Sequence, residues 1–276
     1  MAARSLKRAS GVATPDAFTS LHWQATGSGP PLLLMMGLGL SGGAWWRSVP
    51  TLAERFRVIT YDNRGTGRST ALTYTYTTEA MADDALAVLD SAGVARAHVY
   101  GMSLGGMVAQ QLVLRHPERV GGLVLGATQP GGRRAAVAEP EVLAFFQRRS
   151  ELPSDESAWA SVPYNYSPAA RRRHAARIAE DIAQRLAHPF DEHAYRAQMC
   201  AATLHNCFSR LRRLELPTLV VHGTADRVVP FENAELIAGQ IRGAQLHALR
   251  GCGHLYPTER PSVDAAIGDF LESVGA

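Results

Sequence analysis

The chain has 276 residues, of which 46% are hydrophobic and 19% are charged, and its formal net charge at pH 7 is +3. These values predict a globular protein with one extensive core. The basic residues are dispersed and accompany no nucleic-acid-binding motif, so we expect no nucleic-acid partner. No stretch approaches the ~18 apolar residues of a membrane span, and the N-terminus has no apolar signal-peptide region. We therefore expect a cytoplasmic protein without a membrane partner.

Short apolar runs alternate with amphipathic helical segments through the first 128 residues. Strands are predicted at 31–36, 57–61, 98–100 and 120–125, and helices at about 46–56, at 79–92 and from 104 to 115. The alternation returns near the C-terminus, with strands at 217–222 and 245–249 and helices at 231–241 and 261–274. This pattern is typical of an α/β fold with helices on both faces of a mostly parallel sheet.

The segment 129–213 departs from this alternation, because it carries helical patterns and recurrent prolines but no convincing strand. We expect a helical cap there, inserted into a core domain formed by residues 1–128 and 214–276. Large apolar cap residues are candidates for lining a pocket, although packing of the cap on the core would explain each of them equally well. They are Phe145, Phe146, Trp159, Tyr164, Tyr166, Met199 and Phe208.

The segment Gly101-Met102-Ser103-Leu104-Gly105 matches the motif G-x-S-x-G between a predicted strand and a predicted helix. Such a serine sits on a sharp turn with its hydroxyl clear of the backbone, and side chains at the two glycine positions would collide. The helix N-terminus also directs positive dipole toward a developing oxyanion. We interpret Ser103 as a nucleophile.

A serine nucleophile needs a base, and in this topology the chain order is Ser, then Asp or Glu, then His. His254 lies in a glycine-containing loop after the last predicted strand and is our candidate base. Asp226 follows the strand at 217–222, at the sheet edge where α/β proteins place their sites, and is the candidate acid that orients His254.

We expect other polar residues of these loops and strand ends to have structural roles. Asp62 is the alternative carboxylate, but it precedes the serine in the chain, so we interpret Asp62 and Arg64 as residues that brace a loop. His222 ends the strand before Asp226 and is interpreted as structural. The three cysteines include no C-x-x-C pair, and no histidine pair has metal-ligand spacing, so we expect neither a disulfide framework nor a metal.

Acyl transfer also needs two backbone N–H donors for the oxyanion. Leu104 directly follows the candidate nucleophile and should supply one of them. Leu38, in the loop Met36-Gly37-Leu38-Gly39 after the first predicted strand, should supply the other. The donors are main-chain groups, so a leucine side chain is acceptable at both positions.

Taken together, these motifs resemble the α/β-hydrolase superfamily over nearly the whole chain outside the cap. The resemblance is carried by MGLG with Trp45-Trp46, YDNRGTGRS, GMSLGG, HGTADRVVP, and GCGH followed by Pro257. Within the superfamily the chain is similar to bacterial esterases and lactonases, including 3-oxoadipate enol-lactonase-like and aclacinomycin methylesterase-like hydrolases. The resemblance implies an eight-stranded core sheet, a cap over the site and no cofactor. One departure is Met36-Gly37, where many relatives have His-Gly.

These features predict a hydrolase that cleaves an ester or lactone of a small organic substrate through an acyl-enzyme on Ser103. Two alternatives use the same three side chains: a carbon–carbon bond hydrolase and a cofactor-free perhydrolase of the haloperoxidase type. An alternative of another class is a non-catalytic ligand-binding receptor that keeps the pocket. The sequence leaves open whether the chain forms a homo-oligomer.

Overall fold

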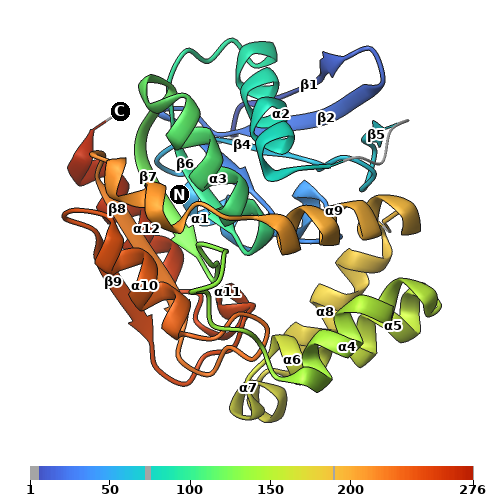
Figure 1. The fold of residues 1–276 in the computed structure, drawn as a ribbon. Helices are drawn as coiled ribbons and strands as arrows, with labels where there is room; N and C mark the ends of the chain where they lie inside the picture. Colours follow the sequence, from blue (N-terminus) through green and yellow to red (C-terminus); the bar gives the residue numbers. More distant parts are fainter. Residues whose placement is uncertain (1–5, 72–75, 189, 276) are drawn as a thin grey trace, which may run out of the picture.

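The computed structural model describes residues 6–71, 76–188 and 190–275, and it is built around one twisted sheet (Figure 1). The main path of this nine-stranded sheet has the order β1-β2-β4-β3-β6-β7-β8-β9, and β5 pairs with β2. Pairing is antiparallel among β1, β2, β4 and β5 and parallel from β4 through to β9. The strands are β1 (Arg8–Asp16), β2 (Thr19–Thr26), β3 (Pro31–Met35), β4 (Arg57–Tyr61), β5 (Thr70–Ala71), β6 (Ala97–Met102), β7 (Val120–Gly126), β8 (Thr218–Gly223) and β9 (Gln245–Leu249).

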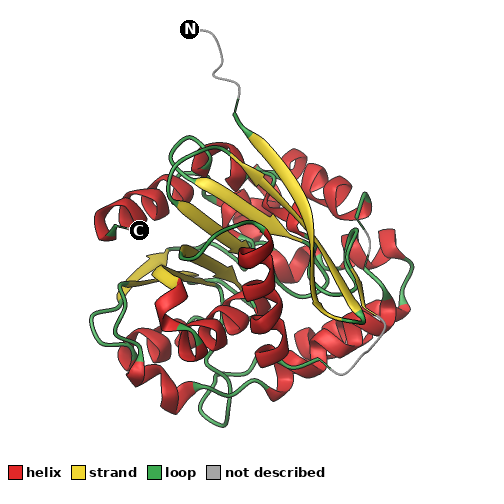
Figure 2. Cartoon of the chain, turned by 90° about the horizontal axis from the view of Figure 1, so that it is seen from above, coloured by secondary structure: helices red, strands yellow, loops and turns green. Residues whose placement is uncertain are grey.

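Helices cover both faces of the sheet, as Figure 2 shows from above. The core helices are α1 (Ser48–Leu52), α2 (Thr78–Ser91), α3 (Leu104–Arg115), α10 (Glu232–Gln240), α11 (Tyr256–Glu259) and α12 (Val263–Val274), with short 3-10 helices η1 (Gly42–Trp45) and η2 (Pro117–Arg119). Side chains of β3 alternate between two hydrophobic clusters: Leu33 packs with α2, α3 and α10, whereas Leu32 and Leu34 pack with α1 and α12. The predicted α/β fold with a mostly parallel, helix-covered sheet is confirmed.

Two local predictions differ from the structure. The hairpin of β1 and β2 is not among the predicted elements, because β1 is largely exposed and presents no apolar run, with only Ala13 fully buried. The helix expected at about 46–56 is limited to α1, since Phe56 must leave the helix to enter the core directly before β4.

Between β7 and β8 the described chain forms a group of helices at one side of the sheet, which we refer to as the cap (Figure 1). They are α4 (Pro140–Arg148), η3 (Arg149–Glu151), α5 (Ser154–Ala160), α6 (Val162–Asn165), α7 (Pro168–Arg173), α8 (Ala175–Leu186), α9 (Glu192–Leu204) and η4 (Phe208–Arg213). Asp181 of α8 anchors this group to the core, because its carboxylate binds Arg47 Nε at 2.8 Å and Thr258 Oγ1 at 2.5 Å. The anchor fixes the position of the helices that border the pocket described below.

Asp264, in the first turn of α12, has a buried carboxyl group whose protonation state affects the free energy of unfolding. Burial raises its pKa to about 6, against an opposing hydrogen bond from Ser48, and its Oδ1 has no partner within the described structure. The unfolded chain releases this proton near pH 4, so between pH 4 and 6 the folded state binds more protons than the unfolded state. The contribution of Asp264 to the free energy of unfolding therefore falls over this range and stays low above it.

We expect Asp264→Asn to raise the free energy of unfolding at pH 8 by up to about 3 kcal/mol relative to the parent protein, because the amide cannot ionise. Below pH 4 the two proteins should converge. Urea unfolding of both proteins at pH 4, 6 and 8 measures the difference. A variant that is destabilised more at pH 8 than at pH 4 would show the opposite linkage and contradict this account.

Candidate active site

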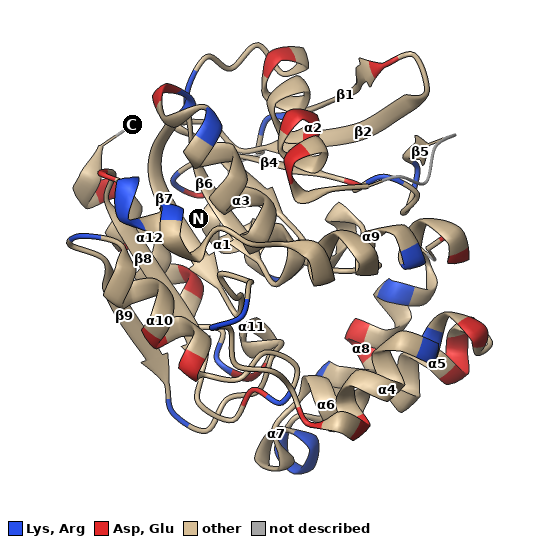
Figure 3. Ribbon diagram, viewed as in Figure 1, with Lys and Arg blue, Asp and Glu red and all other residues tan. Residues whose placement is uncertain are grey.

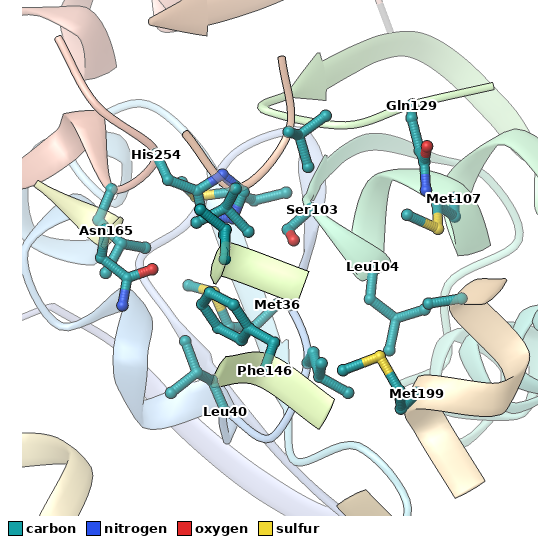
Figure 4. A pocket seen from close by; sticks show the side chains of 18 of the residues that line it. Met36, Leu40, Ser103, Leu104, Met107, Gln129, Phe146, Asn165, Met199 and His254 are labelled. Carbon is teal, nitrogen blue, oxygen red and sulfur yellow. The ribbon is translucent and has the colours of Figure 1, made fainter. Parts of the chain in front are cut away.

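Ser103 lies on the turn between β6 and α3 with φ 57° and ψ −121°. Positive φ is unfavourable for a residue with a Cβ, so the surrounding contacts must hold this conformation. The Ser103 N–H donates to the Gly126 carbonyl at 2.9 Å, and the Ser103 carbonyl accepts from Thr128 Oγ1 at 2.7 Å. The main chain of Ser103 is thus fixed, while its side chain faces the pocket shown in Figure 4.

The motif glycines are required by close approach of backbone atoms. A Cβ on Gly101 would lie 2.3 Å from the Gly105 carbonyl oxygen, and a Cβ on Gly105 would lie 2.0 Å from the Met35 carbonyl oxygen. Both distances are far inside van der Waals contact. The sharp turn at Ser103 therefore depends on glycine at these two positions.

Asp226 and His254, which are far apart in the chain, meet at the carboxyl ends of β8 and β9. His254 Nδ1 lies 2.7 Å from Asp226 Oδ2. The other oxygen, Oδ1, accepts from the backbone N–H groups of Val228 at 2.8 Å and Val229 at 2.9 Å. An imidazole nitrogen that faces a carboxylate carries the proton, so neutral His254 keeps the lone pair on Nε2, the nitrogen needed for a base.

His222 is a second histidine on the same carboxylate. Its Nε2 lies 3.2 Å from Asp226 Oδ2 and 2.9 Å from the Val229 carbonyl oxygen, so Nε2 faces two acceptors and carries the proton. Burial opposes ionisation of Asp226, but the two neighbouring histidines and their hydrogen bonds outweigh it, and the pKa of Asp226 lies well below its usual range. Asp226 is therefore a carboxylate at any pH where the protein would work.

The loop of residues 36–39 lies against Ser103. A Cβ on Gly37 would lie 3.0 Å from Ser103 Cβ, which shows how closely this backbone approaches the serine. The N–H groups of Leu38 and Leu104 form no hydrogen bond within the described part of the chain. Two backbone donors near Ser103 are thus available to an oxyanion.

Gln198 of α9, which the sequence patterns do not single out, fixes this loop from the cap side. Its side chain is fully buried, with Oε1 accepting from the Gly39 N–H at 2.9 Å and Nε2 donating to the Arg64 carbonyl at 2.8 Å. A glutamine in the middle of an amphipathic helix gives no local sign of such a contact, because its partners lie more than 130 residues away in the chain.

Ser103 and His254 line one pocket between the sheet edge and the cap (Figure 4). The space open to the centre of a water-sized molecule is about 180 Å³. Most of its walls are apolar, and they include Met36, Leu38, Leu40, Met102, Leu104, Met107, Val142, Leu143, Phe146, Met199, Val228, Val229 and Leu255. Asn165, Arg149, Arg185 and Gln129 add polar groups. An apolar pocket with a few polar groups is typical of a small-molecule site.

Only two of the seven candidate cap residues, Phe146 and Met199, line this pocket. Trp159 is half exposed, and the hydroxyl of buried Tyr166 donates to Asp181 at 2.9 Å within the cap. Helical periodicity identifies an apolar face but not the element that the face covers, so the sequence could not separate these roles.

Asp62 and Arg64 form their hydrogen bonds with residues of the core and do not line the pocket. Asp62 accepts from the backbone N–H groups of Gly42 at 2.9 Å and Arg68 at 3.0 Å. Arg64 Nη2 donates to Asp84 Oδ1 at 2.7 Å. These contacts tie the loop after β4 to η1 and α2.

The charged residues do not indicate another kind of site. Figure 3 shows basic and acidic residues interspersed over the core and the cap in this view. In residues 6–71, 76–188 and 190–275 no group of three or more His, Cys, Asp or Glu side chains is arranged to hold a metal ion. No helix of the described segments has the length and apolar character needed to cross a membrane.

The fold agrees with comparison to known proteins. The family model described as alpha/beta hydrolase fold matches residues 30–261. The chain therefore belongs to the α/β-hydrolase family, as its motifs suggested, and it is a hydrolase of that fold.

The named relatives act on different substrates. "Putative carbamate hydrolase RutD" of Variovorax paradoxus (strain S110) is 34% identical over 263 residues, which cover 93% of this chain and 97% of that protein. The 2-hydroxymuconate semialdehyde hydrolase of Pseudomonas sp. (strain CF600) is 32% identical, with 94% and 92% covered. The solved structure of the enol-lactonase from Burkholderia xenovorans LB400 superimposes with a TM-score of 0.82 at 26% identity, with 93% and 99% covered.

Proposed function

We propose that the protein is a serine hydrolase that cleaves an ester or lactone of a small organic molecule. The observation that carries this proposal is the placement of Ser103 on a strained turn that opens into the same pocket as His254, while His254 is hydrogen-bonded to the buried carboxylate of Asp226. A strained residue that shares a pocket with an oriented histidine is the arrangement expected of an activated nucleophile.

In the proposed reaction His254 Nε2 takes the proton of Ser103 as Oγ attacks the substrate carbonyl carbon. The N–H groups of Leu38 and Leu104 stabilise the negative oxygen that forms. Protonated His254 then gives its proton to the leaving alkoxide, and Asp226 stabilises the imidazolium. Water attacks the acyl-enzyme in the same way and restores free Ser103.

Esters and lactones are favoured as substrates because the pocket offers a nucleophile, a base and two N–H donors, which together suffice for acyl transfer. The relative named enol-lactonase supports this choice. Cleavage of a carbon–carbon bond is the second candidate, supported by the relative named for 2-hydroxymuconate semialdehyde. Ligand binding without turnover is an outcome that the experiment below distinguishes, whereas perhydrolysis would need peroxide in place of water as the second nucleophile.

Treatment with a fluorophosphonate tests the proposal directly. We expect one equivalent to attach to the peptide that contains Ser103, and p-nitrophenyl acetate hydrolysis to fall in proportion to the labelled fraction, because the phosphorus adduct mimics the tetrahedral intermediate. Mass spectrometry of the digested protein locates the label. Labelling of a different residue, or labelling of Ser103 in a protein that turns over no ester, would contradict the proposed function.

A further inference from the structure

Arg149, at the start of η3, is a buried cation on the wall of the pocket that contains Ser103. It is 6% exposed. Of its five N–H donors, only the one on Nε has a partner in the described structure, Ser157 Oγ at 3.2 Å. No described carboxylate lies within the 4.0 Å that defines an ion pair with its guanidinium.

Arg64 is the natural comparison within the same molecule. It is also 6% exposed, but its guanidinium forms two hydrogen bonds with the carboxylate of Asp84. Burying a charge is costly unless the charge is paired, and Arg64 follows this rule. Arg149 does not, because its positive charge has no counter-charge among the described residues.

Aromatic rings hold the guanidinium of Arg149 without neutralising it. Its Cζ lies 5.5 Å from the ring centroid of Phe146 and 5.7 Å from those of Phe190 and Tyr195. Cation–π contacts of this kind stabilise a cation over the ring faces but leave its in-plane N–H donors unbonded. The position of Arg149 is therefore fixed while its hydrogen-bonding capacity remains available.

Two of these rings also lie near the part of the pocket that contains Ser103. Phe146 also lines the pocket (Figure 4). The ring of Tyr195 packs on the loop of residues 36–39, where a Cβ on Gly39 would lie 2.7 Å from it. Arg149 and the candidate oxyanion donors thus border the same small space.

A second arginine, Arg185 of α8, adds positive charge to the same pocket. Its guanidinium donates to Ser161 Oγ at 3.3 Å and to the Tyr166 hydroxyl at 3.0 Å, and it forms no ion pair with a described carboxylate. Burial, together with the charge of Arg185, lowers the pKa of Arg149, but an arginine remains protonated in proteins. Two cations without ion-pair partners in one apolar pocket would attract an anion.

We propose that the substrate carries a carboxylate and that Arg149 binds it while Ser103 attacks a separate ester or lactone carbonyl of the same molecule. The inference rests on the proposed hydrolase function and names its substrate class. A carboxylate fits better than a phosphate dianion, because Arg149 is buried with most of its donors unbonded, whereas Arg185 is half-buried and its guanidinium already donates two hydrogen bonds. The planar fork of arginine also suits a carboxylate in a bidentate contact.

Matched ester pairs test the proposal. Mono-p-nitrophenyl glutarate and p-nitrophenyl pentanoate differ by a carboxylate in place of a methyl group on the acyl side, and 4-acetoxybenzoate and 4-methylphenyl acetate differ in the same way on the leaving-group side. We expect Arg149→Gln to lower kcat/KM for the carboxylated member of at least one pair by about 10- to 100-fold, the range expected for a lost charge-assisted hydrogen bond. The neutral members should change by less than about threefold.

Arg148→Gln is the matched control, since Arg148 precedes Arg149 but its side chain is 81% exposed and pairs with Glu151 at the surface. It should leave all four rates unchanged. Arg149→Lys, which keeps the charge but loses the planar fork, should retain part of the preference and guards against a folding defect in the glutamine variant. Equal loss on charged and neutral esters, or no loss on either, would overturn the proposal.

Calorimetric titration in the Ser103→Ala background separates this inference from the hydrolase function. Mono-p-nitrophenyl glutarate should bind more tightly than p-nitrophenyl pentanoate, and the addition of Arg149→Gln should remove the difference. If no ester is hydrolysed but this binding difference is found, the carboxylate site stands and the proposed hydrolysis fails. If the esters are hydrolysed without any carboxylate preference in rate or binding, the proposed hydrolysis stands and the carboxylate site fails.

Discussion

Ser103→Ala should lower kcat for ester hydrolysis by about 10³-fold or more while the protein stays folded. The substitution removes the proposed nucleophile, and the rate that remains would come from substrate binding and the N–H donors of Leu38 and Leu104. The fold should tolerate the change, because Ser103 Oγ forms no hydrogen bond in the described structure and alanine meets the same backbone strain as serine. Hydrolysis of p-nitrophenyl acetate and circular dichroism measure the two properties.

A control serine on the outside of the molecule makes this result specific. Ser273 lies near the end of α12 and bonds only to the Phe270 carbonyl in the described structure. Ser273→Ala should therefore retain full activity. Near-normal esterase activity in a purified Ser103→Ala protein would rule out Ser103 as the nucleophile.

Asp226→Asn should lower kcat by up to ~10⁴-fold, because His254 would lose the partner that sets its tautomer. In the parent protein the carboxylate faces four N–H groups, from Val228, Val229, His222 and His254. Asparagine replaces one oxygen with an NH₂ group, which cannot accept a hydrogen bond. If that group faces His254, Nδ1 becomes the acceptor and the proton moves to Nε2, where the base is needed.

Asp62→Asn is the matched control, because Asp62 is also buried, follows a parallel strand and accepts two backbone N–H bonds. It should mainly reduce the free energy of unfolding. Kinetics and urea unfolding of both variants decide between the two carboxylates. The assignment would be wrong if folded Asp62→Asn were inactive while Asp226→Asn kept its activity.

The low pKa of Asp226 also restricts how pH can act on the site. Folding favours the ionised form of Asp226. The contribution of Asp226 to the free energy of unfolding is therefore present above about pH 4 and is lost as the pH falls further. Protonation of Asp226 therefore cannot explain a loss of activity between pH 5 and 7. Such a loss would have to come from another group.

The sequence predicts the parallel part of the sheet well, because strands buried on both faces are continuous apolar runs between turns. The buried strand at 57–61 has the same bounds in the structure, and so does the edge strand at 245–249, although four of its five residues are exposed. The exposed hairpin of β1 and β2 is missed, since it depends on pairing rather than on its own apolar content. Strand ends and glycine positions were also enough to bring Asp226 and His254 together as hydrogen-bonded partners.

The sequence does not predict the contacts that side chains form within the pocket and within the cap. The sequence predicts only a structural role for His222, because its contact with Asp226 depends on the rotamer of a histidine at the end of a strand. Arg149 gives no local sign of being unpaired, because the absence of a carboxylate neighbour is a property of the folded surroundings. Amphipathic patterns locate helices but do not reveal such polar partners.

The buried amide of Gln198 limits how this protein can be re-engineered. A cap taken from another hydrolase would bring new pocket walls, but it would also remove the acceptor that holds the Gly39 N–H and the donor that holds the Arg64 carbonyl. The transplanted protein would then change both its pocket and the loop that carries the Leu38 N–H. Exchange of substrate preference by cap grafting therefore needs a glutamine retained at position 198, so the cap is not an independent module in protein design.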